Sequence, residues 1–281
     1  MAHPLDDFDR IAAFQVAIWS IYLVGAVLLC TRHDFAHTSG WVYLVILAVA
    51  RIVSASLRLA TISDPGNTDL YIGWGVCSGI GLTLLISINT GLMSRLLKSV
   101  RRANGGHALV TPLMQKVAKL VMLTAVVLFI VGGTQADWDI TDPGGRPDVT
   151  YPVISKVAVS IMVAMLVVSV LEAVYLATVR RCIPEGERRI LLAVFLTLPF
   201  ATVRLSYSAC LVYGAYSPSA WFSLGLEVMM EVIAAAIFEV IGFTLRKETT
   251  HDEPVQLRDS SDPEQQVQEA KESSSSNTLL R

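Results

Sequence analysis

Long apolar blocks alternate with short polar connectors along most of the chain. A helix that crosses a membrane needs about 20 predominantly apolar residues, because each residue rises about 1.5 Å through a hydrocarbon core of about 30 Å. Seven blocks meet this requirement: residues 11–31, 41–62, 70–94, 113–134, 153–179, 190–213 and 221–245. These blocks are continuous apolar runs rather than segments of alternating polarity, which excludes a membrane β-barrel. We therefore predict an all-α membrane protein with seven transmembrane helices.

Polar segments flank the apolar blocks and complete the predicted domain organisation. Residues 1–10 carry three aspartates, and we assign them to a short extracytoplasmic N-terminus. Residues 11–245 form the predicted seven-helix transmembrane domain. Residues 246–281 are polar and rich in serine, with too little apolar surface to offset the entropy cost of ordering, so we predict a disordered cytosolic tail. This tail could bind a cytosolic partner, and its serines could be phosphorylated.

Positive charges in the connectors predict the orientation of the chain, because cytosolic connectors of membrane proteins are enriched in lysine and arginine. One alternating set of connectors contains most of these residues: Arg32, Arg95, Lys98, Arg101, Arg102, Arg180, Arg181, Arg188, Arg189, Arg246 and Lys247. The other set contains only Arg10 and Arg146. We therefore place the N-terminus outside, or in a lumen, and the C-terminus in the cytosol. The plasma membrane is the default location, an endomembrane is the alternative, and Cys182 at a cytosolic helix end is a candidate for palmitoylation.

Composition and motifs exclude several classes of function. The chain is 53% hydrophobic and only 16% charged, whereas soluble domains are about 25% charged. A net charge of −2 argues against a nucleic-acid partner. The acidic loop at 137–142 lacks the glycine and the terminal glutamate of a calcium loop, and the chain has no phosphate-binding glycine loop. We therefore expect no metal and no cofactor, and the bilayer itself is the main expected partner.

Several ionisable and polar side chains fall inside the predicted spans. A charged residue at the centre of a span costs about 2.5–3.5 kcal/mol on insertion scales, so such residues are expected to face the interior of the bundle. Two pairs share one helical face each, because they are seven and four residues apart: Arg51 with Arg58, and Glu227 with Glu231. The complete candidate polar cluster consists of Arg51, Arg58, Asn89, Arg204, Tyr207, Glu227 and Glu231.

Depth in the membrane predicts which of these charges pair, because an unpaired ion in lipid is far less stable than a paired one. Arg58, Arg204 and Glu227 fall in the outer half of the membrane, so both arginines are predicted to pair with Glu227. Arg51 and Glu231 fall near the middle and are predicted to pair with each other. Three arginines against two carboxylates would leave one positive charge, which could receive an anionic ligand.

The cluster admits more than one interpretation. Its ion pairs could serve only to fix the register of the helices. They could instead line a polar cavity, open to the outer face between the second, third, sixth and seventh helices, in a non-enzymatic and receptor-like protein that binds or moves a small amphipathic molecule. The alternative is an integral-membrane enzyme of secondary metabolism, such as a terpene cyclase or isomerase, with Glu231 as the acid and Glu227 or Arg204 tuning it. A scaffold that recruits partners through its tail is a third hypothesis.

Small residues and a proline modify two of the predicted helices. Gly73, Gly75, Gly79 and Gly81 line the outer half of the third block, where they allow backbones to approach closely or leave room for a ligand. Pro199 removes a backbone hydrogen bond from the sixth block and predicts a kink.

A series of short motifs resembles a known family. The sequence Arg32-His33-Asp34-Phe35 is followed by Ser39-Gly40-Trp41, by Arg51-Ile52 with Ser54, and by Ala60-Thr61-Ile62-Ser63. This series resembles a fungal family of uncharacterised seven-helix integral membrane proteins, classified as a domain of unknown function, and the likeness covers all seven helices without the tail. The chain is more distantly similar to fungal lipid-translocating exporters and to receptor-like seven-helix proteins of fungi. The resemblance implies a fungal source and a seven-helix fold, and it implies no activity and no site.

Overall fold

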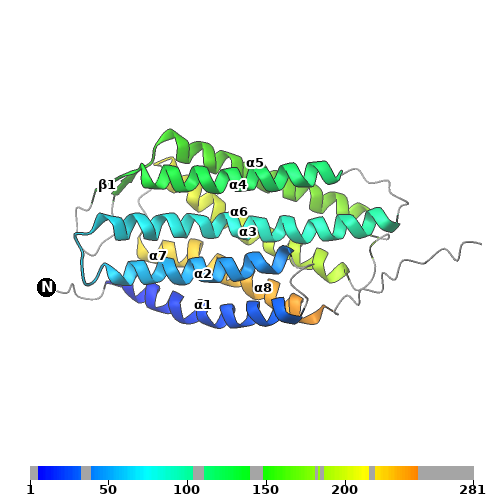
Figure 1. Cartoon of the computed structure of the whole chain (residues 1–281), viewed down its shortest axis with the longest axis horizontal. Helices are drawn as coiled ribbons and strands as arrows, with labels where there is room; N and C mark the ends of the chain where they lie inside the picture. The colour runs from blue at the N-terminus through cyan, green and yellow to red at the C-terminus, as the bar shows by residue number, and fades with distance from the viewer. Residues whose placement is uncertain are drawn as a thin grey trace, which may run out of the picture. The chain divides into compact units, whose positions relative to one another are not determined.

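The structure is a computed structural model that describes residues 6–32, 39–103, 111–139, 148–180, 183, 187–214 and 219–245. Its helices are α1 (Asp7–Arg32), α2 (Ser39–Ala60), α3 (Thr68–Ala103), α4 (Pro112–Thr134), α5 (Val153–Thr178), α6 (Arg188–Val212), α7 (Ala220–Ser223), the π-helix η2 (Leu224–Met229) and α8 (Met230–Thr244). These helices lie side by side along the long axis of the bundle (Figure 1). The predicted tail and Cys182 lie outside the described residues.

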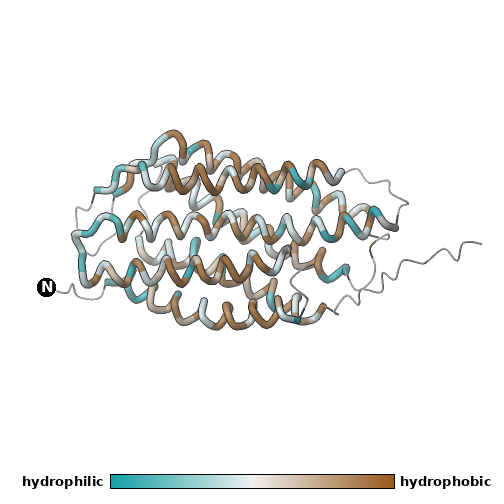
Figure 2. The backbone as a smooth tube through the Cα atoms, viewed as in Figure 1, coloured by the Kyte–Doolittle hydropathy of each residue, from teal (hydrophilic) through white to brown (hydrophobic). Residues whose placement is uncertain are grey.

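The all-α fold and the membrane-spanning character of the chain are confirmed. Six helices, α1 to α6, are long and apolar enough to cross a membrane. Hydrophobic residues dominate long stretches of these helices (Figure 2), and many of them face outward: Ile21, Val24, Leu113, Leu120, Leu123, Val153 and Leu171 are all exposed. Apolar side chains on the outside of a bundle are suited to contact with lipid, because the acyl chains of the bilayer are themselves apolar. The chain is therefore an integral membrane protein.

The seventh predicted block is helical throughout, but it is not a regular α-helix. Residues 220–244 pass through the short α7, the six-residue π-helix η2 and then α8. A π-helical turn contains an extra residue and is often found at functional sites. Glu227 lies in η2 and Glu231 lies in the first turn of α8.

Helix α3 is the centre of the bundle, since it packs against α2, α4, α5, α6 and α8. Its 36 residues span about 54 Å, which exceeds the thickness of the hydrocarbon core. Figure 1 shows α3 running through the middle of the bundle between α2 and α4. Its core-facing side is fully buried over several turns, at Leu82, Leu85, Ile86, Ile88, Met93 and Leu96.

Glycines on α3 allow side chains of neighbouring elements to reach its backbone. A Cβ atom at Gly79 would lie 1.6 Å from Cε1 of Phe129 on α4, so the phenyl ring occupies the space that a side chain would need. A Cβ at Gly81 would lie 2.7 Å from Nε of Arg51 on α2. The glycines of α3 therefore have two roles. Gly79 permits close packing of α4, and Gly81 makes room for a buried guanidinium group.

A short antiparallel hairpin connects α4 to α5 and was not predicted. Strand β1 (Asp137–Asp139) pairs with β2 (Asp148–Thr150), and Trp138 lies opposite Val149. The indole Nε1 of Trp138 donates a hydrogen bond to the carbonyl of Gly133 at 3.1 Å. A Cβ at Gly75 would lie 2.4 Å from the indole ring, so Trp138 packs directly on α3.

Replacement of Gly79 by alanine tests the close approach of Phe129 to α3. We expect Gly79→Ala to lower the free energy of unfolding by about 1–3 kcal/mol, because an added methyl group overpacks the contact. Gly225→Ala in η2 is the matched control, because a Cβ there would meet nothing within 4 Å. Unfolding in mixed detergent micelles measures both variants, and equal stability of the two would contradict the packing described here.

Candidate functional site: a buried ion-pair cluster

Four charged side chains from three parts of the chain meet inside the bundle. Arg51 comes from α2, Arg204 from α6, Glu227 from η2 and Glu231 from α8. All four are buried, and Glu231 has an exposed fraction of 0%. The sequence therefore places opposite charges on α2, on α6 and on the η2–α8 segment, and the fold brings them together.

Each carboxylate of this cluster is shared between both arginines. Oε1 of Glu231 accepts hydrogen bonds from Nη2 of Arg51 and, at 2.8 Å, from Nε of Arg204. Oε1 of Glu227 lies 3.1 Å from Nη2 of Arg204 and 3.4 Å from Nη1 of Arg51. The predicted pairs Arg51–Glu231 and Arg204–Glu227 are thus present, within one four-membered network rather than as separate pairs.

Hydroxyl groups of three serines extend the network. Ser78 on α3 donates to Oε1 of Glu227 and accepts from Nη1 of Arg51 at 3.1 Å. Ser223 donates to Oε2 of Glu227 at 3.1 Å, and Ser208 accepts from Nη1 of Arg204. A buried ion pair is stabilised when further hydrogen bonds satisfy its remaining polar atoms, and these serines do so for Glu227 and for one nitrogen each of Arg51 and Arg204. Among the described residues, Nε of Arg51 and Oε2 of Glu231 have no hydrogen-bond partner. None of these three serines is predicted from the sequence, since a single serine in a span carries little signal.

Arg58 pairs differently from the prediction. Its Nε lies 3.1 Å from Oδ1 of Asp9, and both side chains are buried. The rings of Phe8, Tyr71 and Trp74 surround the guanidinium group, with centroids 5.1–5.7 Å from Cζ. Cation–π contacts of this kind add to the stability of a desolvated cation.

The prediction that Arg58 pairs with Glu227 is wrong because α1 begins at Asp7, four residues before the predicted start of the first span. Asp9 was assigned to a solvated N-terminus, whereas it lies on the first turn of α1 and is buried. The three buried arginines thus face three carboxylates, Asp9, Glu227 and Glu231. The predicted surplus positive charge is therefore wrong as well.

The other two residues of the candidate cluster, Tyr207 and Asn89, are not members of the four-membered network. Tyr207 is buried beside Arg204, whose Cζ lies 5.9 Å from the ring centroid. Asn89 lies eleven residues beyond Ser78 on α3, which corresponds to about 16 Å along the helix. Its Oδ1 accepts a hydrogen bond from Thr197 on α6 at 2.9 Å, so it joins α3 to α6 outside the four-membered network.

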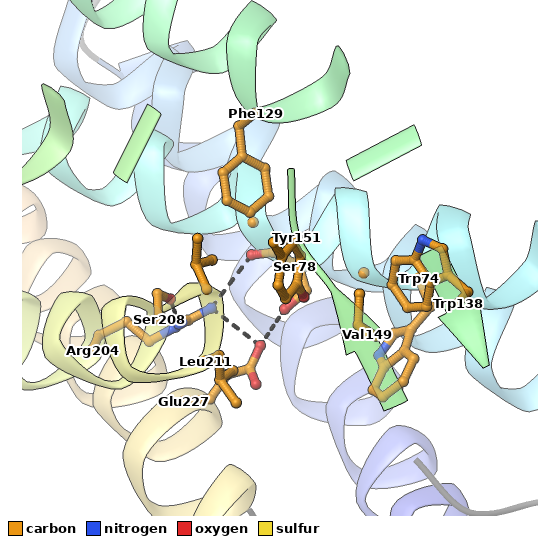
Figure 3. Close-up of a pocket in the computed structure, with 13 residues that line it drawn as sticks. Trp74, Ser78, Phe129, Trp138, Val149, Tyr151, Arg204, Ser208, Leu211 and Glu227 are labelled. Carbon is orange, nitrogen blue, oxygen red and sulfur yellow. Dashed lines mark hydrogen bonds and ion pairs between the residues drawn. The ribbon is translucent and has the colours of Figure 1, made fainter. Parts of the chain in front are cut away.

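A small cavity lies beside the network and reaches toward the hairpin. Its volume is about 50 Å³, and Arg204, Ser208, Ser78 and Glu227 form its polar side. Aromatic residues form another part of its wall: Trp74, Phe129, Trp138 and Tyr151. Figure 3 shows Arg204 and Glu227 facing each other across the hydrogen bond network, with the aromatic side chains of the other elements nearby. The cavity has room for one or two water molecules, each of which takes about 30 Å³ in the liquid.

The site offers no arrangement of metal ligands in the part of the chain that the structure describes. No group of three or more histidine, cysteine, aspartate or glutamate side chains could hold an ion there. Cys30, Cys77 and Cys210 are free thiols. The chemistry available at the site is therefore hydrogen bonding and charge pairing by guanidinium, carboxylate and hydroxyl groups.

The fold and the buried charges define a polytopic helical membrane protein. Residues 5–248 match the family described as a domain of unknown function (DUF7702), and the chain belongs to that family. No curated protein matches the chain in sequence. The matched region includes every helix that contributes to the ion-pair cluster.

The pair of Asp9 and Arg58 can be tested by a double-mutant cycle. Asp9→Asn should destabilise the protein by about 3–5 kcal/mol, because it leaves a buried guanidinium group without a counter-charge. The double variant Asp9→Asn/Arg58→Met should recover part of this loss, since removal of both charges is less costly than removal of one. Unfolding in mixed micelles measures the cycle, and additive effects of the two substitutions would contradict the pairing.

Proposed function

We propose that the protein is a non-enzymatic, receptor-like membrane protein that binds, or binds and moves, a small amphipathic molecule at the cavity beside the ion-pair cluster. The observation that carries this proposal is the lining of the cavity. A guanidinium group and a carboxylate lie on one side, and the indole rings of Trp74 and Trp138 lie on another. Binding sites for small molecules commonly combine an apolar, aromatic wall with a few placed polar groups.

The proposed orientation has seven spans, with 220–244 as the seventh, the N-terminus outside and the C-terminus in the cytosol. The distribution of lysine and arginine among the connectors supports it. In this orientation the β1–β2 hairpin lies on the outer side, so that a ligand would approach the cavity from outside the cell or from a lumen. The plasma membrane remains the default location, and the resemblance of the sequence motifs supports a fungal source.

The size of the cavity limits what can occupy it. Pockets that enclose whole drug-sized ligands have volumes of about 300–1,000 Å³, whereas this cavity has about 50 Å³. We infer that only the polar end of the ligand enters and that its apolar part lies against Trp74, Trp138 and Tyr151. Entry of a larger part would require displacement of the hairpin, which carries Trp138 and Val149.

The charge balance of the cluster bears on the chemistry of that polar end. Two arginines and two glutamates share the network, and Arg58 has its own partner in Asp9. A ligand with a full negative charge would therefore have to compete with the glutamates for the guanidinium groups. A neutral group that both donates and accepts hydrogen bonds, such as an alcohol or an amide, fits the site better.

The enzyme alternative receives less support from this geometry. A cyclase or isomerase of the kind considered needs a protonated carboxylic acid that reaches its substrate. Glu231 accepts hydrogen bonds from two guanidinium groups, and it is not among the described residues that line the cavity. Glu227 does line the cavity, but it accepts hydrogen bonds from Arg204 and from two serines.

A cavity-filling substitution tests the proposed binding site. Leu211 on α6 lines the cavity, so Leu211→Trp should block it without altering any charge. Leu192→Trp on the same helix is the matched control, because Leu192 faces outward with an exposed fraction of 56%. Untargeted mass spectrometry of molecules that copurify from native membranes should find a compound with the wild-type and Leu192→Trp proteins that is at least tenfold depleted with Leu211→Trp. Equal recovery from both variants would contradict binding at this cavity.

Metabolite profiles of cells and medium, with and without the gene, distinguish the proposed function from the enzyme alternative. Binding or transport predicts unchanged compounds, or a changed partition of a compound between cells and medium. Accumulation of a new intermediate in the cells that lack the gene would instead favour the enzyme.

A further inference from the structure

A second and larger cavity lies on the outside of the bundle, where α2, α3 and α4 meet. Its volume is about 240 Å³, and it shares no lining residue with the cavity beside the ion-pair cluster. Its walls are mostly apolar, with Ile46 from α2, Ile80 and Leu84 from α3, and Met122, Leu123 and Val126 from α4. Ile46 and Leu123 are exposed on the surface of the bundle, so the groove faces the lipid.

The few polar residues of this groove gather at one end. Tyr43 lies near the start of α2, and Lys119 lies in the first third of α4. Thr90 lies far along α3, with Ser87 one turn before it. Helices α2 and α4 run antiparallel to α3, which brings these positions to the same level. Two contacts establish this register: a Cβ at Gly40 would lie 3.2 Å from Leu92, and Phe129 packs against Gly79. The apolar residues Ile80 and Val126 lie toward the other end.

Among the described residues that line the groove, Lys119 alone is charged. It is exposed, and no acidic side chain in the described ranges forms an ion pair with it. A lysine inside a span directs its ammonium group toward the membrane interface while its alkyl stem lies along apolar surface. Lys116, one turn earlier on α4, and Lys98, near the end of α3, add exposed positive charge at the same end of the bundle.

We propose that this groove is a binding site for an anionic phospholipid of the leaflet on the side of the basic connectors. The ammonium group of Lys119 and the hydroxyl of Tyr43 bind the phosphate group of the lipid. One acyl chain lies in the groove along Ile80, Leu84 and Met122. Charge complementarity selects the lipid, because the groove presents a positive charge at its polar end and none along its apolar part. This site is independent of the proposed ligand cavity.

Competition between two lipids tests the site on the full-length protein in detergent. Native mass spectrometry of protein that has been stripped of lipid and incubated with equal amounts of phosphatidylglycerol and phosphatidylcholine should show preferential binding of the anionic lipid. Lys119→Gln should reduce this preference about fivefold, because the variant loses the charge-assisted hydrogen bond from the ammonium group to the lipid phosphate. Lys116→Gln is the matched control, because it removes an exposed lysine one turn away that does not line the groove.

The control should keep at least two thirds of the wild-type preference. Equal binding of the two lipids to the wild-type protein would overturn the proposal. An equal loss of preference in Lys119→Gln and Lys116→Gln would also overturn it, because that result indicates a diffuse attraction to positive charge rather than a defined site. Loss of ligand copurification in Leu211→Trp leaves this lipid test unaffected, since the two cavities have no residue in common.

Discussion

Charges inside a membrane protein must find partners before they can be buried, and this requirement shapes the centre of the bundle. Arg51, Arg204, Glu227 and Glu231 meet on elements that are distant in sequence, and each carboxylate accepts from both guanidinium groups. Loss of any member would leave a buried charge without its counter-charge. The network therefore holds α2, α6 and the η2–α8 segment in one register around α3.

Helix α3 makes this arrangement possible with small residues and hydroxyl groups rather than with charges. Gly81 leaves the space that the guanidinium group of Arg51 occupies, and Ser78 bridges Arg51 to Glu227. Gly79 and Gly75 admit Phe129 and Trp138, respectively, to the backbone of α3. The aromatic wall of the ligand cavity and the ion-pair cluster thus depend on the same two turns of α3, which couples the proposed binding site to the packing of the bundle.

Hydrophobic length and charge placement predict much of this fold because lipid constrains a sequence strongly. Every apolar block became a helix, and depth matching identified the Arg51–Glu231 pair. The Arg58–Asp9 pair could not be predicted, since it depends on α1 beginning four residues before its apolar block. The β1–β2 hairpin was missed because three-residue strands carry almost no periodic signal. The serines of the network and the size of the cavity follow only from side-chain packing in three dimensions.

A double-mutant cycle on Arg204 and Glu231 tests most directly whether the ion-pair network holds the helices together. We expect Arg204→Gln and Glu231→Gln each to lower the free energy of unfolding by about 3–5 kcal/mol. Their effects should be non-additive, with a coupling energy of at least about 1 kcal/mol, because each change removes the counter-charge of the other residue. Additive effects, or single variants as stable as Glu172→Gln on α5, would contradict the account.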